Sequence, residues 1–110
     1  MNQVQLPTAI SLFYAIHLDN IEMDIIQCLS PDACLEDEGH FYQGHQEIKN
    51  WFTSAMQKYQ FQAEPLKIIE NQSQHISILT RVSGQFPNSP IQITYQFKLN
   101  QNLITHVIIS

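Results

Sequence analysis

Residues 31–48 read PDACLEDEGHFYQGHQEI, and this stretch predicts a short strand, a tight turn at Gly39, a return strand and a helix that opens after Gly44. Alternate residues of a strand share one face, so Asp37 points the same way as Ala33 and Leu35. If the two apolar side chains face the core, the carboxylate does too. An inward carboxylate is costly unless it is paired, hydrated or functional, which makes Asp37 the first candidate for a functional residue.

The residues that follow predict the clearest helix of the chain. Apolar side chains recur at every third or fourth position, which is the period of an amphipathic helix of about four turns. We interpret this aromatic-rich stripe as a face that packs on the core rather than as a cofactor site. Its members are Ile48, Trp51, Phe52, Ala55, Met56 and Tyr59.

Two shorter helices are predicted upstream. The first has Thr8 as its N-cap and runs to Leu18, and it is apolar nearly all round, which is typical of a buried helix. The ring of Tyr14 should therefore lie at least partly inside. Asp19 ends this helix, and apolar residues at a spacing of four predict the second helix over residues 21–29.

Strand signals dominate the second half of the chain. Pro65 implies that the first of these strands is an edge strand or carries a bulge. A run of helices followed by a run of strands predicts an α+β domain, with a curved antiparallel sheet wrapped around the N-terminal helices as a cone with a central pocket. The predicted strands cover residues 61–70, 75–86, 91–99 and 103–109, with a turn at 87–90.

Composition narrows the classes of partner. The chain has 110 residues, of which 44% are hydrophobic, and we expect one domain over residues 1–110. Ten acidic residues outnumber five scattered basic ones, which argues against nucleic acids and anionic membranes as partners. The first seven residues lack the features of a signal peptide, so we expect a cytoplasmic protein in which Cys28 and Cys34 are reduced and structural.

Three segments together resemble the nuclear transport factor 2-like superfamily, in particular its SnoaL-like and ketosteroid isomerase-like branch. The first is DACLED at 32–37, followed by GHQEI at 44–48 and by Trp51 and Phe52. The second is the pair Phe13 and Tyr14 with Asp19 beyond it. The third, SGQFPNSP at 83–90 before Tyr95 and Phe97, is similar to small bacterial SnoaL-like proteins. The resemblance covers nearly the whole chain.

The resemblance implies a cofactor-independent proton transfer. Asp37 matches the carboxylate that removes a proton next to a carbonyl, and Tyr14 matches the tyrosine that donates a hydrogen bond to the oxyanion. Tyr95 stands where the isomerases have a protonated Asp, which departs from the steroid isomerase pattern. A tyrosine donates without a raised pKa, so two tyrosines are a reasonable oxyanion site. The resemblance also implies a small apolar ligand and a homodimer through the outer sheet face.

Other interpretations stay open at this point. Asp37 is either the base or a strand-end carboxylate bonded to the Gly39 turn, and Tyr14 is either a donor or a core tyrosine. The protein is accordingly an isomerase or cyclase-type enzyme, or a non-catalytic ligand-binding or dimeric interaction module. We expect no metal, because His40 and His45 fit exposed turn positions. The expected pocket residues are Phe13, His17, Trp51, Phe52, Ile93 and Phe97.

Overall fold

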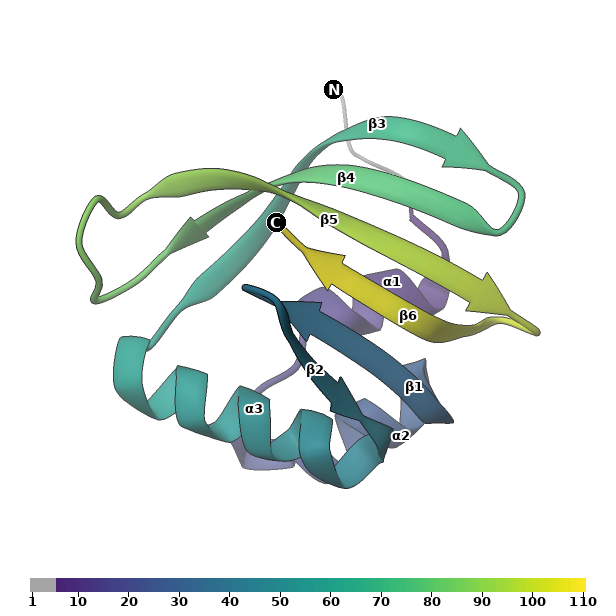
Figure 1. The fold of residues 1–110 in the computed structure, drawn as a ribbon, viewed down its shortest axis with the longest axis horizontal. Helices are drawn as coiled ribbons and strands as arrows, with labels where there is room; N and C mark the ends of the chain where they lie inside the picture. The colour runs from purple at the N-terminus through teal and green to yellow at the C-terminus, as the bar shows by residue number, and fades with distance from the viewer. Residues whose placement is uncertain (1–5) are drawn as a thin grey trace.

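The computed structural model describes residues 6–110, and Figure 1 shows the helices on one side of a curved sheet. The helices are α1 (Thr8–Tyr14), α2 (Ile21–Cys28) and α3 (Gly44–Tyr59), with a short 3₁₀ turn (Leu18–Asn20) between the first two. The strands are β1 (Leu29–Asp37), β2 (His40–Gln43), β3 (Gln62–Gln72), β4 (His75–Ser83), β5 (Ile91–Asn100) and β6 (Leu103–Ile109).

The six strands form one open sheet in the order β2-β1-β6-β5-β4-β3. All neighbours are antiparallel except β1 and β6, which run parallel. The expected sheet was antiparallel throughout, so this pair is a difference. Parallel strands need a long connection, and the elements from β2 to β5 supply one, because they all lie between β1 and β6 in the chain. The α+β class and the curvature of the predicted cone are confirmed (Figure 1).

The hydrophobic core lies between the helices and the inner face of the sheet. Period-2 alternation turns Ile78, Tyr95 and Phe97 of the middle strands inward, and all three are buried. The apolar stripe of α3 contributes Ile48 and Phe52, which are also buried. The two strongest periodic patterns in the sequence therefore meet at one interface.

The hairpin turn and the long helix lie where they were predicted, although β1 begins at Leu29, two residues before the predicted start of the strand. Glu38 and Gly39 connect β1 to β2, both with positive φ (53° and 79°), which suits a two-residue hairpin turn. Helix α3 covers 16 residues, as its period indicated. Pro65 lies on β3, which is an edge strand, and the pairing with β4 shifts just after it. Both expectations for this proline are confirmed.

The N-terminal helices are shorter than predicted. Helix α1 ends at Tyr14 instead of Leu18, and Thr8 lies inside it, with Pro7 at the N-cap. After the helix, His17 is extended and its backbone N–H donates to Asp24 Oδ2 at 3.1 Å. This bend returns the chain to α2 and leaves Leu18 exposed. The apolar pattern had suggested one continuous helix through Leu18, and that prediction was wrong.

Two expectations about the location of the protein concern its N-terminus and its helices. The absence of a signal peptide was argued from the first seven residues, and residues 1–5 lie outside the described residues. Among residues 6–110, no helix is long and apolar enough to cross a membrane.

Candidate active site

A cavity of about 310 Å³ opens beside the tip of the β1–β2 hairpin, and we call it the Asp37 cavity. Its walls come from the hairpin, from α3 and from the inner face of the middle strands. Most of its lining is apolar, and two adjacent carboxylates, those of Asp37 and Glu38, lie in its wall. It is lined by Asp37, Glu38, Trp51, Ala55, Tyr59, Phe61, Val82, Phe86, Pro87, Ile91, Ile93, Tyr95 and Ile109.

The sheet register places the two predicted functional residues of the strands in one row. Asp37 on β1 pairs with Ile109 on β6, and Ile109 pairs with Tyr95 on β5. Paired residues of neighbouring strands share a face, so the carboxylate and the phenol point to the same side of the sheet. Two strand spacings separate their Cα atoms by about 10 Å.

Trp51 holds the Asp37 carboxylate from the opposite wall. Its indole Nε1–H donates to Oδ2 at 3.1 Å, and this engages one carboxylate oxygen. The indole itself is packed against neighbouring rings, with its centroid 4.8 Å from that of Phe52 and 6.2 Å from that of Tyr42. The donor is therefore positioned by packing before any ligand arrives.

The environment of Asp37 disfavours its charged form. Desolvation by the cavity walls raises the pKa of the carboxyl, and the negative charge of Glu38 raises it further. The hydrogen bond from Trp51 and the nearby His40 oppose this in part. The balance is a carboxyl with a raised pKa that is still partly open to solvent.

A second cavity, of about 220 Å³, lies between α1, α3 and the start of β3, and we call it the Tyr14 cavity. It is mostly apolar and contains no carboxylate among its lining residues. It is lined by Phe13, Tyr14, Ile16, His17, Phe52, Met56, Phe61, Gln62, Ala63 and Tyr95.

The Tyr14 side chain is held by a hydroxyl that the sequence interpretation missed. Its phenol oxygen lies 2.7 Å from Thr80 Oγ1, and its ring stacks on Tyr95 with centroids 5.6 Å apart. Burial raises the pKa of the Tyr14 phenol, while the bond with Thr80 lowers it. Thr80 has the parity of Ile78 on β4, so the alternation of that strand was the signal that would have placed it inside.

The single proton of the Thr80 hydroxyl has two acceptors within reach. The carbonyl oxygen of Ile78 is 3.2 Å from Thr80 Oγ1, whereas the Tyr14 oxygen is 2.7 Å away. Ordinary O–H···O bonds measure about 2.5–3.0 Å, so the shorter contact is the better hydrogen bond. Both bonds form at once when Thr80 donates to the Ile78 carbonyl oxygen and the Tyr14 phenol donates to Thr80.

Tyr95 borders both cavities. It is buried on the inner face of β5, and burial, followed by the proximity of Tyr14 and Asp37, raises the pKa of its phenol. The phenol is therefore a neutral donor at ordinary pH. Tyr95 shares one cavity with Asp37 and the other with Tyr14, so the three predicted functional residues adjoin without lining a single space.

The remaining expected pocket residues divide between the two spaces. Trp51 and Ile93 line the Asp37 cavity, while Phe13, His17 and Phe52 line the Tyr14 cavity. Phe97 lines neither of the two. It is fully buried, with its ring centroid 5.4 Å from that of Phe13, and it belongs to the core beneath them.

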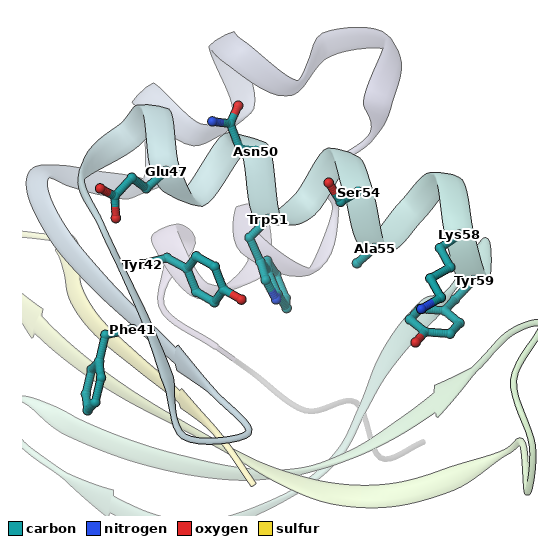
Figure 2. Close-up of a pocket in the computed structure, with 9 residues that line it drawn as sticks. All are labelled: Phe41, Tyr42, Glu47, Asn50, Trp51, Ser54, Ala55, Lys58 and Tyr59. Carbon is teal, nitrogen blue, oxygen red and sulfur yellow. The ribbon is translucent and has the colours of Figure 1, made fainter.

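A third hollow lies outside the cavities, between the hairpin and the outer side of α3. Figure 2 shows this groove, of about 570 Å³, with Trp51 reaching from α3 toward the hairpin and Phe41 pointing away from the helix. Trp51, Ala55 and Tyr59 also line the Asp37 cavity, so the two hollows adjoin along α3. The remaining groove residues are Phe41, Tyr42, Glu47, Asn50, Ser54 and Lys58.

Histidines and cysteines do not add a reactive centre to this region. His40 is exposed as expected, but His45 is not a turn histidine: it lies in the first turn of α3, half-buried, with Nε2 2.9 Å from the Leu29 carbonyl oxygen. Burial raises the pKa of the Cys28 thiol to about 12, and desolvation also raises that of Cys34. Within residues 6–110 no three His, Cys, Asp or Glu side chains gather as a metal site.

Comparisons with solved structures agree with this fold. A scan against models of protein families gives no match, and a search of the curated proteins gives none. A Sinorhizobium meliloti protein that carries the provisional name polyketide cyclase is similar in structure, with a TM-score of 0.87 and 30% identity, over 96% of this chain and 95% of that one.

Two further solved structures share the fold at lower identity. A Mycobacterium tuberculosis protein in complex with estradiol-17β-hemisuccinate has a TM-score of 0.76 and 11% identity, over 96% of this chain and 93% of that one. The Δ5-3-ketosteroid isomerase of a Mycobacterium species has a TM-score of 0.75 and 12% identity, over 93% and 88% of the two chains.

Proposed function

The chain belongs to the nuclear transport factor 2-like superfamily, in its SnoaL-like and ketosteroid isomerase-like branch, and from this premise we propose that it binds a small, largely apolar molecule in the Asp37 cavity. We further propose that Asp37 removes a proton from a carbon next to a carbonyl of that molecule. The reaction class is then an isomerisation or a cyclisation. Neither changes the oxidation state of the substrate, so no redox cofactor is needed.

The observation that carries this proposal is the setting of Asp37. A carboxylate is a weak base in water, and desolvation that raises its pKa moves it toward the range useful for proton abstraction. Here the walls of an apolar cavity raise the pKa of Asp37 while Trp51 fixes one of its oxygens. That arrangement holds a base against bound substrate and keeps it from turning into solvent.

Tyr95 and Tyr14 supply the hydrogen bonds in the proposed step. When the proton moves to Asp37, the electron pair of the C–H bond shifts onto the carbonyl oxygen, where a phenol O–H stabilises the charge. Tyr95 shares the Asp37 cavity and is the nearer donor, and Tyr14 stacks behind it. Return of the proton from Asp37 to a different carbon completes an isomerisation.

Two structural relatives support an apolar, multi-ring ligand class. The similar Mycobacterium tuberculosis structure contains estradiol-17β-hemisuccinate, and another is a ketosteroid isomerase. Both ligand classes suit a cavity lined by aliphatic and aromatic side chains, such as the one beside Asp37.

A generic carbon acid tests the base without knowledge of the natural substrate. The probe is 5-nitrobenzisoxazole, whose ring opens when one C–H proton is removed and whose product absorbs visible light. We expect the wild-type protein to open it at a rate that rises with pH through the raised pKa of Asp37, and Asp37→Asn to lose about 10²–10⁴-fold. Glu36→Gln is the matched control, because Glu36 precedes Asp37 on the opposite face of β1 and does not line the cavity, and this variant should keep most of the rate.

A rate that Asp37→Asn leaves unchanged would contradict the catalytic proposal. One observation favours that alternative, a non-catalytic binding module: the Tyr14 hydroxyl is engaged by Thr80 and lines the other cavity. Binding of apolar ketones with no Asp37-dependent proton transfer would be its signature.

Self-association through the outer sheet face is a separate proposal. That face carries polar side chains of β5, such as Gln96, with Ile108 of β6 beside them at paired positions. It also holds His106, whose buried Nε2 has no hydrogen-bond partner among the described residues. A homodimer would cover this face, and sedimentation velocity of wild type and Ile108→Lys tests it, with a shift of the variant toward monomer expected.

A further inference from the structure

Two side chains, Phe61 and Tyr95, line both the Asp37 cavity and the Tyr14 cavity. We propose that the two cavities are compartments of one ligand site, and that Phe61 is the specificity-determining residue that separates them. Molecules of one or two rings fill the Asp37 compartment alone. Elongated molecules of about four fused rings reach both compartments by displacing the Phe61 ring. This inference rests on the proposed function for its choice of ligand class, and not on Asp37 acting as a base.

The cavity sizes make a single compartment too small for a large ligand. Sites for drug-sized molecules measure about 300–1,000 Å³. The Asp37 cavity, at about 310 Å³, lies at the bottom of that range, and the Tyr14 cavity, at about 220 Å³, lies below it. Joined, they fall well inside the range, so removal of the partition changes which class of molecule the protein accepts.

Of the two shared residues, Tyr95 is fixed. It sits in the middle of β5 between β4 and β6, it is 4% exposed, and its ring stacks on Tyr14. Moving it would disturb the core of the sheet. Tyr95 is therefore the permanent part of the partition.

Phe61 is the part that can move. It lies in the short connection between α3 and β3, after Gln60, whose left-handed backbone (φ 49°) ends the helix, and it is only partly buried. Its ring rests against Phe52 and Trp51, at centroid distances of 6.1 Å and 6.4 Å. Side chains of partly exposed residues change rotamer without moving the backbone, so the ring alone can swing aside.

The backbone of Phe61 is pinned, which confines the motion to the ring. The β4–β5 connection lies directly against it: the Gln85 N–H donates to the Tyr59 carbonyl oxygen at 2.6 Å. A Cβ at Gly84 would lie 2.7 Å from that carbonyl oxygen and 2.9 Å from Phe61 Cα. Only glycine permits this close approach, and it fixes the position from which the Phe61 ring projects.

The polar groups at the two ends define the larger ligand. Asp37 and Trp51 lie in one compartment, and the phenol of Tyr14 lies in the other, with the exposed His17 at its wall. Aromatic and aliphatic side chains fill the space between. The matching molecule is an elongated fused-ring ketone with an oxygen at each end and an apolar middle.

Methionine methyl groups report occupancy of each compartment directly. Met56 lines the Tyr14 compartment, whereas Met23 is 51% exposed on α2 and serves as an internal control. With ¹³C-methyl methionine, we expect the four-ring diketone androstenedione to shift the Met56 signal and the two-ring ketone 1-tetralone to leave it in place. Neither ketone should shift Met23. A Met56 shift of equal size with both ketones would overturn the partition.

Variants of the partition complete the test. Phe61→Ala removes the cost of displacing the ring, so we expect the dissociation constant of androstenedione to fall roughly tenfold while that of 1-tetralone changes less than about threefold. Phe61→Leu keeps a large side chain at this position, so it should lower the dissociation constant of androstenedione by a smaller factor. Phe86 lines only the Asp37 compartment, so Phe86→Ala should weaken the binding of both ketones to the same extent.

The outcomes separate the two proposals. An androstenedione affinity that Phe61→Ala leaves unchanged overturns the partition, whatever Asp37 does to 5-nitrobenzisoxazole. A size-dependent response to Phe61→Ala with no Asp37-dependent ring opening supports the partition and contradicts the catalytic proposal. Failure of both ketones to bind any variant overturns the partition and the proposed ligand class, and leaves the base to be judged by the opening of 5-nitrobenzisoxazole.

Discussion

The two cavities lie on the same inner sheet face, yet they hold opposite kinds of polar group. The Asp37 cavity, next to the exposed hairpin tip, contains the carboxyls of Asp37 and Glu38, while the less open Tyr14 cavity contains neutral phenols, with the buried Thr80 hydroxyl beside it. Burying a charge costs far more than burying a hydroxyl that has a partner. The comparison shows that burial decides which polar groups each cavity can hold. The partly exposed Asp37 can carry a charge, whereas the buried Tyr95 and Thr80 are neutral hydrogen-bonding groups.

The largest expected difference between the two halves is in stability. Phe52 is buried against Phe13 and Trp51 in the wall of the Tyr14 cavity, so Phe52→Ala should lower the free energy of unfolding by about 3–5 kcal/mol. Phe86 on the Asp37 side is only half-buried, and Phe86→Ala should cost about 1 kcal/mol. Urea unfolding of both variants measures the difference, and equal losses would contradict the distinction between an enclosed and an open half.

The close approach at Gly84 gives the next largest effect. Gly84→Ala introduces a methyl group within 3 Å of two backbone atoms, Tyr59 O and Phe61 Cα, so the backbone must shift and we expect a loss of about 1–3 kcal/mol. Gly39→Ala is the matched control for close approach, since a Cβ there meets nothing within 4 Å; its cost comes from its positive φ alone. Thermal unfolding of the two variants shows which loses more stability. A Gly84→Ala variant as stable as wild type would mean that the backbone of the connection between α3 and β3 is free to shift.

Removing the hydroxyl that holds Tyr14 should cost less. Thr80→Val keeps the shape of the buried side chain and deletes the bond to the phenol, for an expected loss of about 0.5–1.5 kcal/mol. Tyr14→Phe deletes the other partner of the same bond. A double-mutant cycle measures their coupling, and strictly additive losses would show that the two hydroxyls do not stabilise each other.

The smallest effect is the pH dependence that Asp37 gives to stability. Because its pKa is raised in the folded protein, folding favours the protonated carboxyl, which adds stability below the unfolded value of 3.8. That contribution disappears as pH rises from 3.8 through the higher folded value. Asp37→Asn should therefore be slightly more stable than wild type at pH 7, and the gap should close toward pH 3. Urea midpoints at the two pH values test the sign.

Local patterns in the sequence were enough for the elements that carry the site. The parity of Asp37 with Ala33 and Leu35 correctly placed it at the inner face, and the period of α3 located Trp51 and Phe52. These inferences worked because a strand or helix face depends on neighbouring residues alone. The curvature of the sheet was expected from the twist of a large antiparallel sheet, and the resemblance to a known superfamily implied the same cone.

What the sequence left undetermined depends on distant residues meeting. The bond between Tyr14 and Thr80 joins α1 to β4, and the partition at Phe61 depends on the approach of Gly84 from another loop. The end of α1 was misplaced for a similar reason, because Asp24 on α2 captures the His17 backbone. No spacing rule along the chain predicts such contacts, since they follow from how separate elements pack.

The parallel pairing of β1 with β6 has a consequence for biogenesis. A ribosome completes the hairpin that carries Asp37 long before it makes β6, so β1 waits with one edge unpaired while the intervening elements are synthesised. Contacts between such distant segments form slowly. Even Ser110 participates, exchanging two backbone hydrogen bonds with Thr94. Asp37 therefore gains one wall of its cavity only when β6 pairs with β1. A nascent chain, or one trimmed at its C-terminus, would contain the whole hairpin around Asp37 but could not enclose a ligand there.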